Sequence, residues 1–153
     1  MNSTIPQEQL KEMLDLAVRK VTEETASVQL FPSGGSLSED VCTVHITFNR
    51  GFHTSLTLCA DTTLLLRMAR NVFGDDFDPG DLEDFSKEYF NVLCGKIAGC
   101  LKEMTNIAAR FSVPTFYRGR YTPEDQRMQF VLTYSDDQCK GAQLGHHVPC
   151  PTI

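Results

Sequence analysis

The chain has 153 residues, with 14 basic and 20 acidic side chains and a formal net charge of −6. This length predicts one domain, taken as residues 1–153. The acidic balance and the lack of a basic stripe argue against nucleic acid and anionic membranes as partners. No apolar run approaches the length of a membrane span, and no charged segment followed by an apolar stretch opens the chain. We therefore expect a cytoplasmic protein without membrane contact.

The cysteines are expected to be reduced. Four of the six lie inside predicted regular elements, and no C-x-x-C motif occurs. In a cytosolic protein such residues are usually small buried hydrophobes rather than disulfide partners. The four are Cys42, Cys59, Cys94 and Cys100.

The first half of the chain reads as a helix, three strands and a second helix. Apolar spacing of three and four predicts a helix over residues 6–25, followed by a short strand over 28–31. Alternating apolar residues predict a half-buried strand over 41–48, which the turn Asn49–Gly51 joins to a strand over 53–60. A second helix is predicted over 62–73, with Gly74 ending it.

The second half begins with a long helix from about residue 82 to 107, with Asp81 as a candidate N-cap. Strands over 115–121 and 126–134 follow. The segment 135–153 shows no periodicity and is expected to be a loose tail. Hairpin-linked strands with grouped helices predict an α+β fold with an antiparallel sheet of about five or six strands.

The long helix carries one polar face. Asp84, Glu88, Asn91 and Gly95 fall within roughly 60° of arc. The opposite side is apolar and is predicted to face the core: Phe85, Tyr89, Val92, Leu93, Ile97, Leu101 and Met104. The polar face therefore presents a carboxylate and a carboxamide one turn apart, a pair that can bind a cation and hold a water molecule.

Two readings of this face remain open. Acidic residues near a helix N-terminus, such as Asp84, are favourable on any solvated helix. Gly95 and Gly99 are not explained in this way, since each glycine costs a helix interior about 1 kcal/mol relative to alanine. Their presence indicates that another backbone approaches closely, belonging either to a partner or to another helix of the same domain.

The other candidate sites are weaker. His45 and His53 are expected at the surface, and His146, His147 and Cys150 form an H-H-x-x-C pattern without an evident fourth metal ligand. The acidic run over residues 75–84 lacks the ligand spacing of an EF-hand. No P-loop, dinucleotide-binding or nucleophile-elbow motif occurs. No metal site is predicted.

A short internal repeat involves the same helix. The segment R-M-A-R-N-V-F-G at residues 67–74 echoes K-E-Y-F-N-V-L-C-G at residues 87–95. Each contains Asn-Val, with a key position three residues before the Asn. That position is Met68 in the first copy and Glu88 in the second.

Read together, Asp84-x3-Glu88-x2-Asn91-x22-Pro114 resembles the signature of the CheC/CheX family of bacterial chemotaxis phosphatases. The likeness in length and element order covers about residues 5–135. The resemblance implies two pseudo-symmetric helices, of which CheX-like members keep one intact motif. The second copy is intact here, whereas Met68 makes the first degenerate and leaves no role for Asn71.

The resemblance also implies function. CheX-like proteins dephosphorylate the aspartyl-phosphate of a CheY-type response regulator, in chemotaxis or another two-component pathway, and form homodimers. Glu88 would pair with the regulator's active-site lysine, and Asn91 would hold the attacking water. Asp84, Gly95 and Gly99 would contact the partner, and Pro114 would be structural. The regulator would carry the Mg²⁺, so the chain needs no metal of its own.

The alternative is a non-catalytic protein on the same fold. Such a chain would bind a response regulator as an adaptor, or serve as an assembly module like the flagellar switch proteins. A polar helix on a simple dimerisation module is a third possibility.

Overall fold

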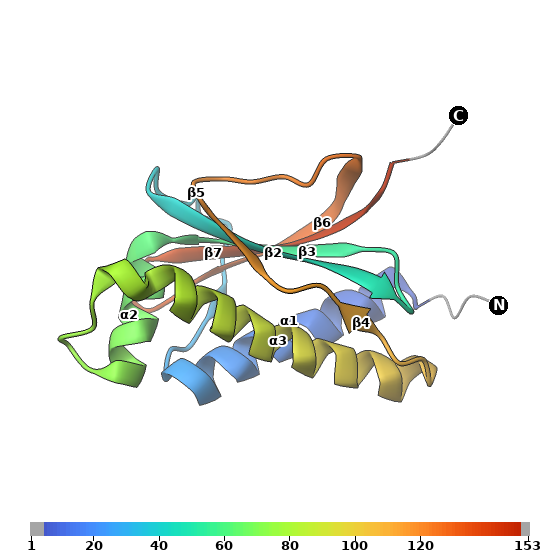
Figure 1. Ribbon diagram of the computed structural model, residues 1–153, viewed down its shortest axis with the longest axis horizontal. Coiled ribbons are helices and arrows are strands. Elements are labelled where there is room, and N and C mark those ends of the chain that lie inside the picture. Colours follow the sequence, from blue (N-terminus) through green and yellow to red (C-terminus); the bar gives the residue numbers. More distant parts are fainter. Residues whose placement is uncertain (1–4, 151–153) are drawn as a thin grey trace.

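The computed structural model describes residues 5–150 as three α-helices and seven strands (Figure 1). The helices are α1 (Gln7–Ala26), α2 (Thr62–Phe73) and α3 (Leu82–Thr105), with a 3-10 turn at Pro79–Asp81. The strands are β1 (Phe31–Pro32), β2 (Val41–Arg50), β3 (Ser55–Asp61), β4 (Arg110–Phe111), β5 (Thr115–Arg118), β6 (Gln126–Ser135) and β7 (Gly141–Pro149).

The strands form one antiparallel sheet in the order β1-β6-β7-β3-β2-β4, and β5 also pairs with β2. Figure 1 shows the three helices together on one face of this sheet, while the connection from β5 to β6 passes over the other face. The α+β class with an antiparallel sheet is therefore confirmed. The pseudo-symmetry of α2 and α3 stays a prediction.

The core lies between the sheet and the helices. The alternation predicted for the strand that became β2 is confirmed, since Val44 and Ile46 are fully buried on the helix-facing side. The strand is more than half-buried, however. Thr43 on the opposite face is also fully buried, and its hydroxyl donates to the backbone oxygen of Gly119 at 2.8 Å. The β5–β6 connection thus covers part of the outer face.

The prediction of a loose tail is wrong. Residues 141–149 form β7, which pairs with β3 on one side and β6 on the other, near the middle of the sheet. The buried Asp61 carboxylate accepts from the Gly141 N–H at 2.7 Å and fixes the start of the strand. Arg67 of α2 binds Asp136 and Asp137, both at 2.6 Å, and so holds the β6–β7 turn. Residues 151–153 lie outside the described part.

Other boundaries differ by smaller amounts. The helix predicted over 62–73 matches α2, whereas the strand predicted over 28–31 appears only as β1, and β4 was missed. Asp81 occupies the N-cap position of α3 but makes no side-chain capping bond. Asp78 caps the preceding 3-10 turn instead, accepting from the Gly80 N–H at 2.9 Å.

All six cysteines are free. Cys42 and Cys94 are buried as predicted, and burial raises the pKa of the Cys94 thiol. Cys59 and Cys100 are only half-buried. Of the helices between residues 5 and 150, none combines the length and hydrophobicity that a bilayer crossing requires.

Candidate functional site: the exposed face of α3

The helix α3 is held in place by its apolar side. Phe90, Leu93 and Ile97 are almost completely buried against the sheet and α1. The hydroxyl groups of Tyr89 and Thr22 of α1 form a hydrogen bond of 2.6 Å, and burial raises the pKa of Tyr89 to about 12. This packing fixes the rotation of α3, and therefore which side chains face the solvent.

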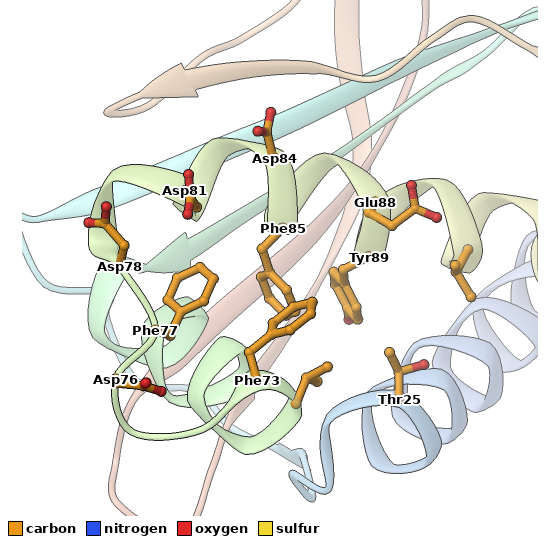
Figure 2. A pocket seen from close by; sticks show the side chains of 12 residues that line it. Thr25, Phe73, Asp76, Phe77, Asp78, Asp81, Asp84, Phe85, Glu88 and Tyr89 are labelled. Carbon is orange, nitrogen blue, oxygen red and sulfur yellow. The ribbon is translucent and has the colours of Figure 1, made fainter.

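The predicted polar residues all lie on the solvent side. Asp84, Glu88 and Asn91 are exposed, and Figure 2 shows the Asp84 and Glu88 carboxylates pointing away from the aromatic rings beneath them. Within residues 5–150, no side-chain hydrogen bond or ion pair engages any of the three. The nearby Lys87 binds Glu83 at 3.0 Å instead. Side chains three residues apart on a helix have Cβ atoms about 5–6 Å apart, so Glu88 and Asn91 can act on one partner.

The two glycines also lie on this face. Gly95 and Gly99 are exposed, and a Cβ atom built at either would meet no atom within 4 Å. The alternative that these glycines admit another helix of the same domain is therefore wrong. Nothing in the described chain requires a missing side chain at either position.

The first motif copy, on α2, is not free to contact a partner. Met68 is only 2% exposed and belongs to the core. The Asn71 side chain donates through Nδ2 to the Ala26 backbone oxygen at 2.8 Å, which satisfies a carbonyl at the C-terminus of α1. Asn71 thus has a structural role, which the sequence comparison of the two copies did not predict.

Pro114 does not share the exposed face. It is buried in the connection between β4 and β5, where a residue without an N–H is tolerated at the start of an edge strand. Its neighbour Ser112 donates its N–H to the Thr47 oxygen at 2.8 Å. Pro114 therefore has the environment of a structural residue.

Sequence reasoning missed a groove beside the polar face. An open groove of about 870 Å³ lies between the end of α2 and the start of α3, and Asp84 and Glu88 form part of its margin. Val92 was predicted to face the core, but it is 44% exposed and lines this groove. The sequence signal for the groove was the apolar pair Val72-Phe73 at the end of α2, because the end of a solvated helix is normally polar.

The histidines are distributed as structural groups. His146 and His147 are adjacent in β7, so their side chains point to opposite faces of the sheet. His146 lies against the Phe130 ring with centroids 4.9 Å apart, and His147 bonds the Thr57 hydroxyl at 2.9 Å. Between residues 5 and 150, no three His, Cys, Asp or Glu side chains are grouped to hold a metal ion. His45 is half-buried beside Tyr121 rather than at the surface.

Comparison of the structure with solved structures gives three informative similarities. The chemotaxis protein CheX from Vibrio vulnificus matches with a TM-score of 0.74 and 16% identity, over 90% of this chain and 97% of that chain. CheX from Borrelia burgdorferi, crystallised as a CheX–CheY–BeF3–Mg²⁺ complex, matches with a TM-score of 0.68 and 14% identity, over 91% and 96%. FliY from Thermotoga maritima matches with a TM-score of 0.62 and 11% identity, over 96% and 92%.

The chain has the CheX/CheC-like fold. No family model matches the sequence, and no curated protein does. In this CheX-like fold, α3 presents Glu88 and Asn91 to the solvent, whereas α2 presents no equivalent pair.

Proposed function

We propose that the chain is a phosphatase that acts on the aspartyl-phosphate of a CheY-type response regulator. The observation that carries the proposal is the joint exposure of Glu88 and Asn91, unengaged by other described residues, on a CheX-like fold. The Borrelia CheX complex with CheY supports the choice of partner. The proposal implies a cytoplasmic protein that works in chemotaxis or another two-component pathway.

The proposed reaction requires no covalent bond to this chain. A water molecule attacks phosphorus in line with the aspartyl oxygen, the bond between phosphorus and that oxygen breaks, and phosphate and a free aspartate result. The regulator holds the Mg²⁺, which neutralises phosphoryl charge. Catalysis by this chain then consists of positioning.

The proposed roles follow from the side chains. The Asn91 carboxamide both donates and accepts hydrogen bonds, so it can fix the orientation of the attacking water. The Glu88 carboxylate would pair with the regulator's active-site lysine and set the docked pose. Asp84 extends the negative face by one turn, and Gly95 and Gly99 let the partner's backbone approach α3 closely.

The test is the decay of phosphorylated regulators. Each CheY-type regulator of the source organism is phosphorylated with acetyl phosphate and magnesium, and its decay is followed with and without catalytic amounts of this chain. We expect faster decay with at least one regulator. Asn91→Ala should lower turnover by about 10²-fold or more with little effect on docking, whereas Glu88→Ala should also weaken binding. Unchanged decay for every regulator contradicts the proposal.

Two matched controls use exposed residues away from the site. Asn49→Ala removes a carboxamide at the end of β2, and Glu124→Ala removes a carboxylate from the connection between β5 and β6. Both variants should keep wild-type turnover. If they lose activity as Asn91→Ala and Glu88→Ala do, the loss reflects general damage rather than the proposed roles.

The alternative is a non-catalytic function on the same fold. In that case the chain would bind a regulator or assemble with other proteins without shortening the lifetime of the phosphoryl group. The same assay separates the two functions, because an adaptor binds the regulator and leaves its decay unchanged. Self-association as a homodimer is part of both proposals and does not distinguish them.

A further inference from the structure

The groove between α2 and α3 collects apolar side chains that the fold leaves uncovered. Phe73 is 63% exposed, and Val72 and Val92, which are also exposed, line the same groove. These three are among only eight large hydrophobic residues exposed in the described chain. Because isolated exposed residues are normal but gathered ones mark interaction sites, their meeting in one groove indicates a ligand.

The floor of the groove is a packed group of aromatic rings. Phe73 stacks on Phe77 with centroids 5.8 Å apart, and both meet Phe85 edge-on at 6.3 and 6.2 Å. Phe85 in turn stacks on Tyr89, whose hydroxyl is fixed by α1. Figure 2 shows these rings between the end of α2 and the start of α3. A surface held in this way can seat an apolar side chain without first reorganising.

The margin of the groove is uniformly acidic. No lysine or arginine of the described chain lines the groove. Five carboxylates do: Asp76, Asp78, Asp81, Asp84 and Glu88. The helix dipole favours Asp81 and Asp84 near the start of α3, but it does not explain Asp76 or Glu88. Such a margin disfavours phosphate, nucleic acid and anionic lipid, and attracts basic side chains.

We propose that this groove seats a segment of the response regulator in which an apolar side chain is flanked by lysine or arginine. The inference rests on the proposed function and adds a second contact to the same partner. Glu88 belongs both to the polar face and to the groove margin, so a regulator that reaches Glu88 also reaches the groove that Phe73 lines. The groove would supply affinity and choice of regulator, and Asn91 the chemistry.

The test separates binding from turnover. The probe is the purified regulator loaded with magnesium and BeF3, and its dissociation constant is measured by calorimetry. Turnover is measured separately at saturating phosphorylated regulator. Phe73→Ser should weaken binding at least 10-fold, equivalent to about 1.4 kcal/mol, while turnover at saturation stays within about twofold of wild type. Val113→Ser, at the most exposed large hydrophobic residue of the described chain, is the matched control and should change neither.

A second variant tests the charge and does not depend on Phe73. Neither Asp76 nor Asp81 makes a side-chain bond with the rest of the described chain, so Asp76→Asn/Asp81→Asn should fold normally. It should weaken binding several-fold at low salt and much less near 1 M salt, where the Debye length falls to roughly 3 Å.

The outcomes are distinguishable. Regulator binding that depends on Phe73 but produces no hydrolysis supports the groove and removes the proposed phosphatase activity. Hydrolysis with wild-type affinity in both groove variants overturns the groove and leaves the activity. Failure of the wild-type chain to bind any regulator overturns both. Dissociation of a dimer by Phe73→Ser, with unchanged regulator affinity, assigns the groove to a second copy and also overturns the inference.

Discussion

Replacing the two exposed glycines of α3 by alanine should change stability and binding in opposite directions. Gly95 and Gly99 lie in the interior of a 24-residue helix, and an added Cβ at either meets no atom within 4 Å. A glycine in such a position costs about 0.8–1.0 kcal/mol relative to alanine. Each substitution should therefore raise the free energy of unfolding by about that amount. In a chain of this length, about 1 kcal/mol corresponds to a rise of roughly 2–4 °C in Tm.

The two effects are measured separately. Urea unfolding followed by circular dichroism gives the stability of the isolated protein, and titration with the regulator gives its affinity. We expect Gly95→Ala and Gly99→Ala to stabilise the chain and to weaken binding, because the methyl groups would stand between α3 and the partner's backbone. As a control, Gly145→Ala should destabilise the chain, since its Cβ would lie 2.9 Å from Thr57 Oγ1.

Two results would refute this reasoning. Destabilisation by Gly95→Ala would mean that the helix itself requires glycine at this position, contrary to the open space around it. Stabilisation with unchanged affinity would mean that no partner backbone approaches this part of α3. In that second case, Gly95 and Gly99 would be removed from the proposed interface while Glu88 and Asn91 remained.

Three further predictions concern residues outside the proposed interface or contrast with it. Asn71→Ala should cost about 1 kcal/mol in urea unfolding, because it removes the bond to the Ala26 oxygen, whereas Asn91→Ala should stay within about 0.5 kcal/mol. Burial, and to a lesser extent His147, lowers the pKa of His146 from 6.5 to about 4. Between pH 6.5 and 4, His146 therefore binds a proton in the unfolded chain but not in the folded chain. The free energy of unfolding should fall over this range by up to about 3 kcal/mol. His146→Gln should flatten that slope in urea midpoints measured at pH 7 and 5. A chain ending at Ser135 should give no cooperative unfolding transition by circular dichroism, because β3 and β6 both lose the strand between them.

The sequence predicted those elements whose burial follows a simple period. The helix over 62–73 has a strong apolar stripe ended by Gly74, and its bounds agree with α2. The polar face of α3 was also predictable, because Phe85, Tyr89, Leu93 and Ile97 leave only one side of the helix for solvent. In both cases the signal is local, and tertiary packing reinforces it.

The strand β7 could not be recognised in the same way. Its alternating residues include Ala142, Leu144 and His146, of which only leucine is a large apolar side chain. Gly141 and Gly145 further lower its strand propensity, although a Cβ at Gly141 would lie 2.6 Å from the Leu37 side chain and one at Gly145 would lie 2.9 Å from Thr57 Oγ1. The close packing of neighbours on both faces, rather than the hydrophobicity of the segment, makes β7 a strand.

The groove was missed for a related reason. Phe73 ends one helix and Phe85 lies in the first turns of the next, and nothing in either segment alone shows that their rings meet. The acidic stretch between them reads in sequence as a solvated loop, and Val92 reads as a core residue. These residues line one groove only because the fold places the end of α2 and the loop after it against the start of α3 (Figure 2).

The contrast between α2 and α3 explains why the proposed site lies on α3 alone. Both helices carry Asn-Val, but α2 uses its asparagine to satisfy the end of α1 and places Met68 in the core. Restoring a carboxylate there by Met68→Glu would bury an unpaired charge, which costs several kcal/mol, and Asn71 would still be engaged. A second active copy therefore cannot be recovered by one substitution. Any phosphatase activity left in Asn91→Ala should accordingly be unchanged by the further substitution Asn71→Ala, because α2 contributes none of it.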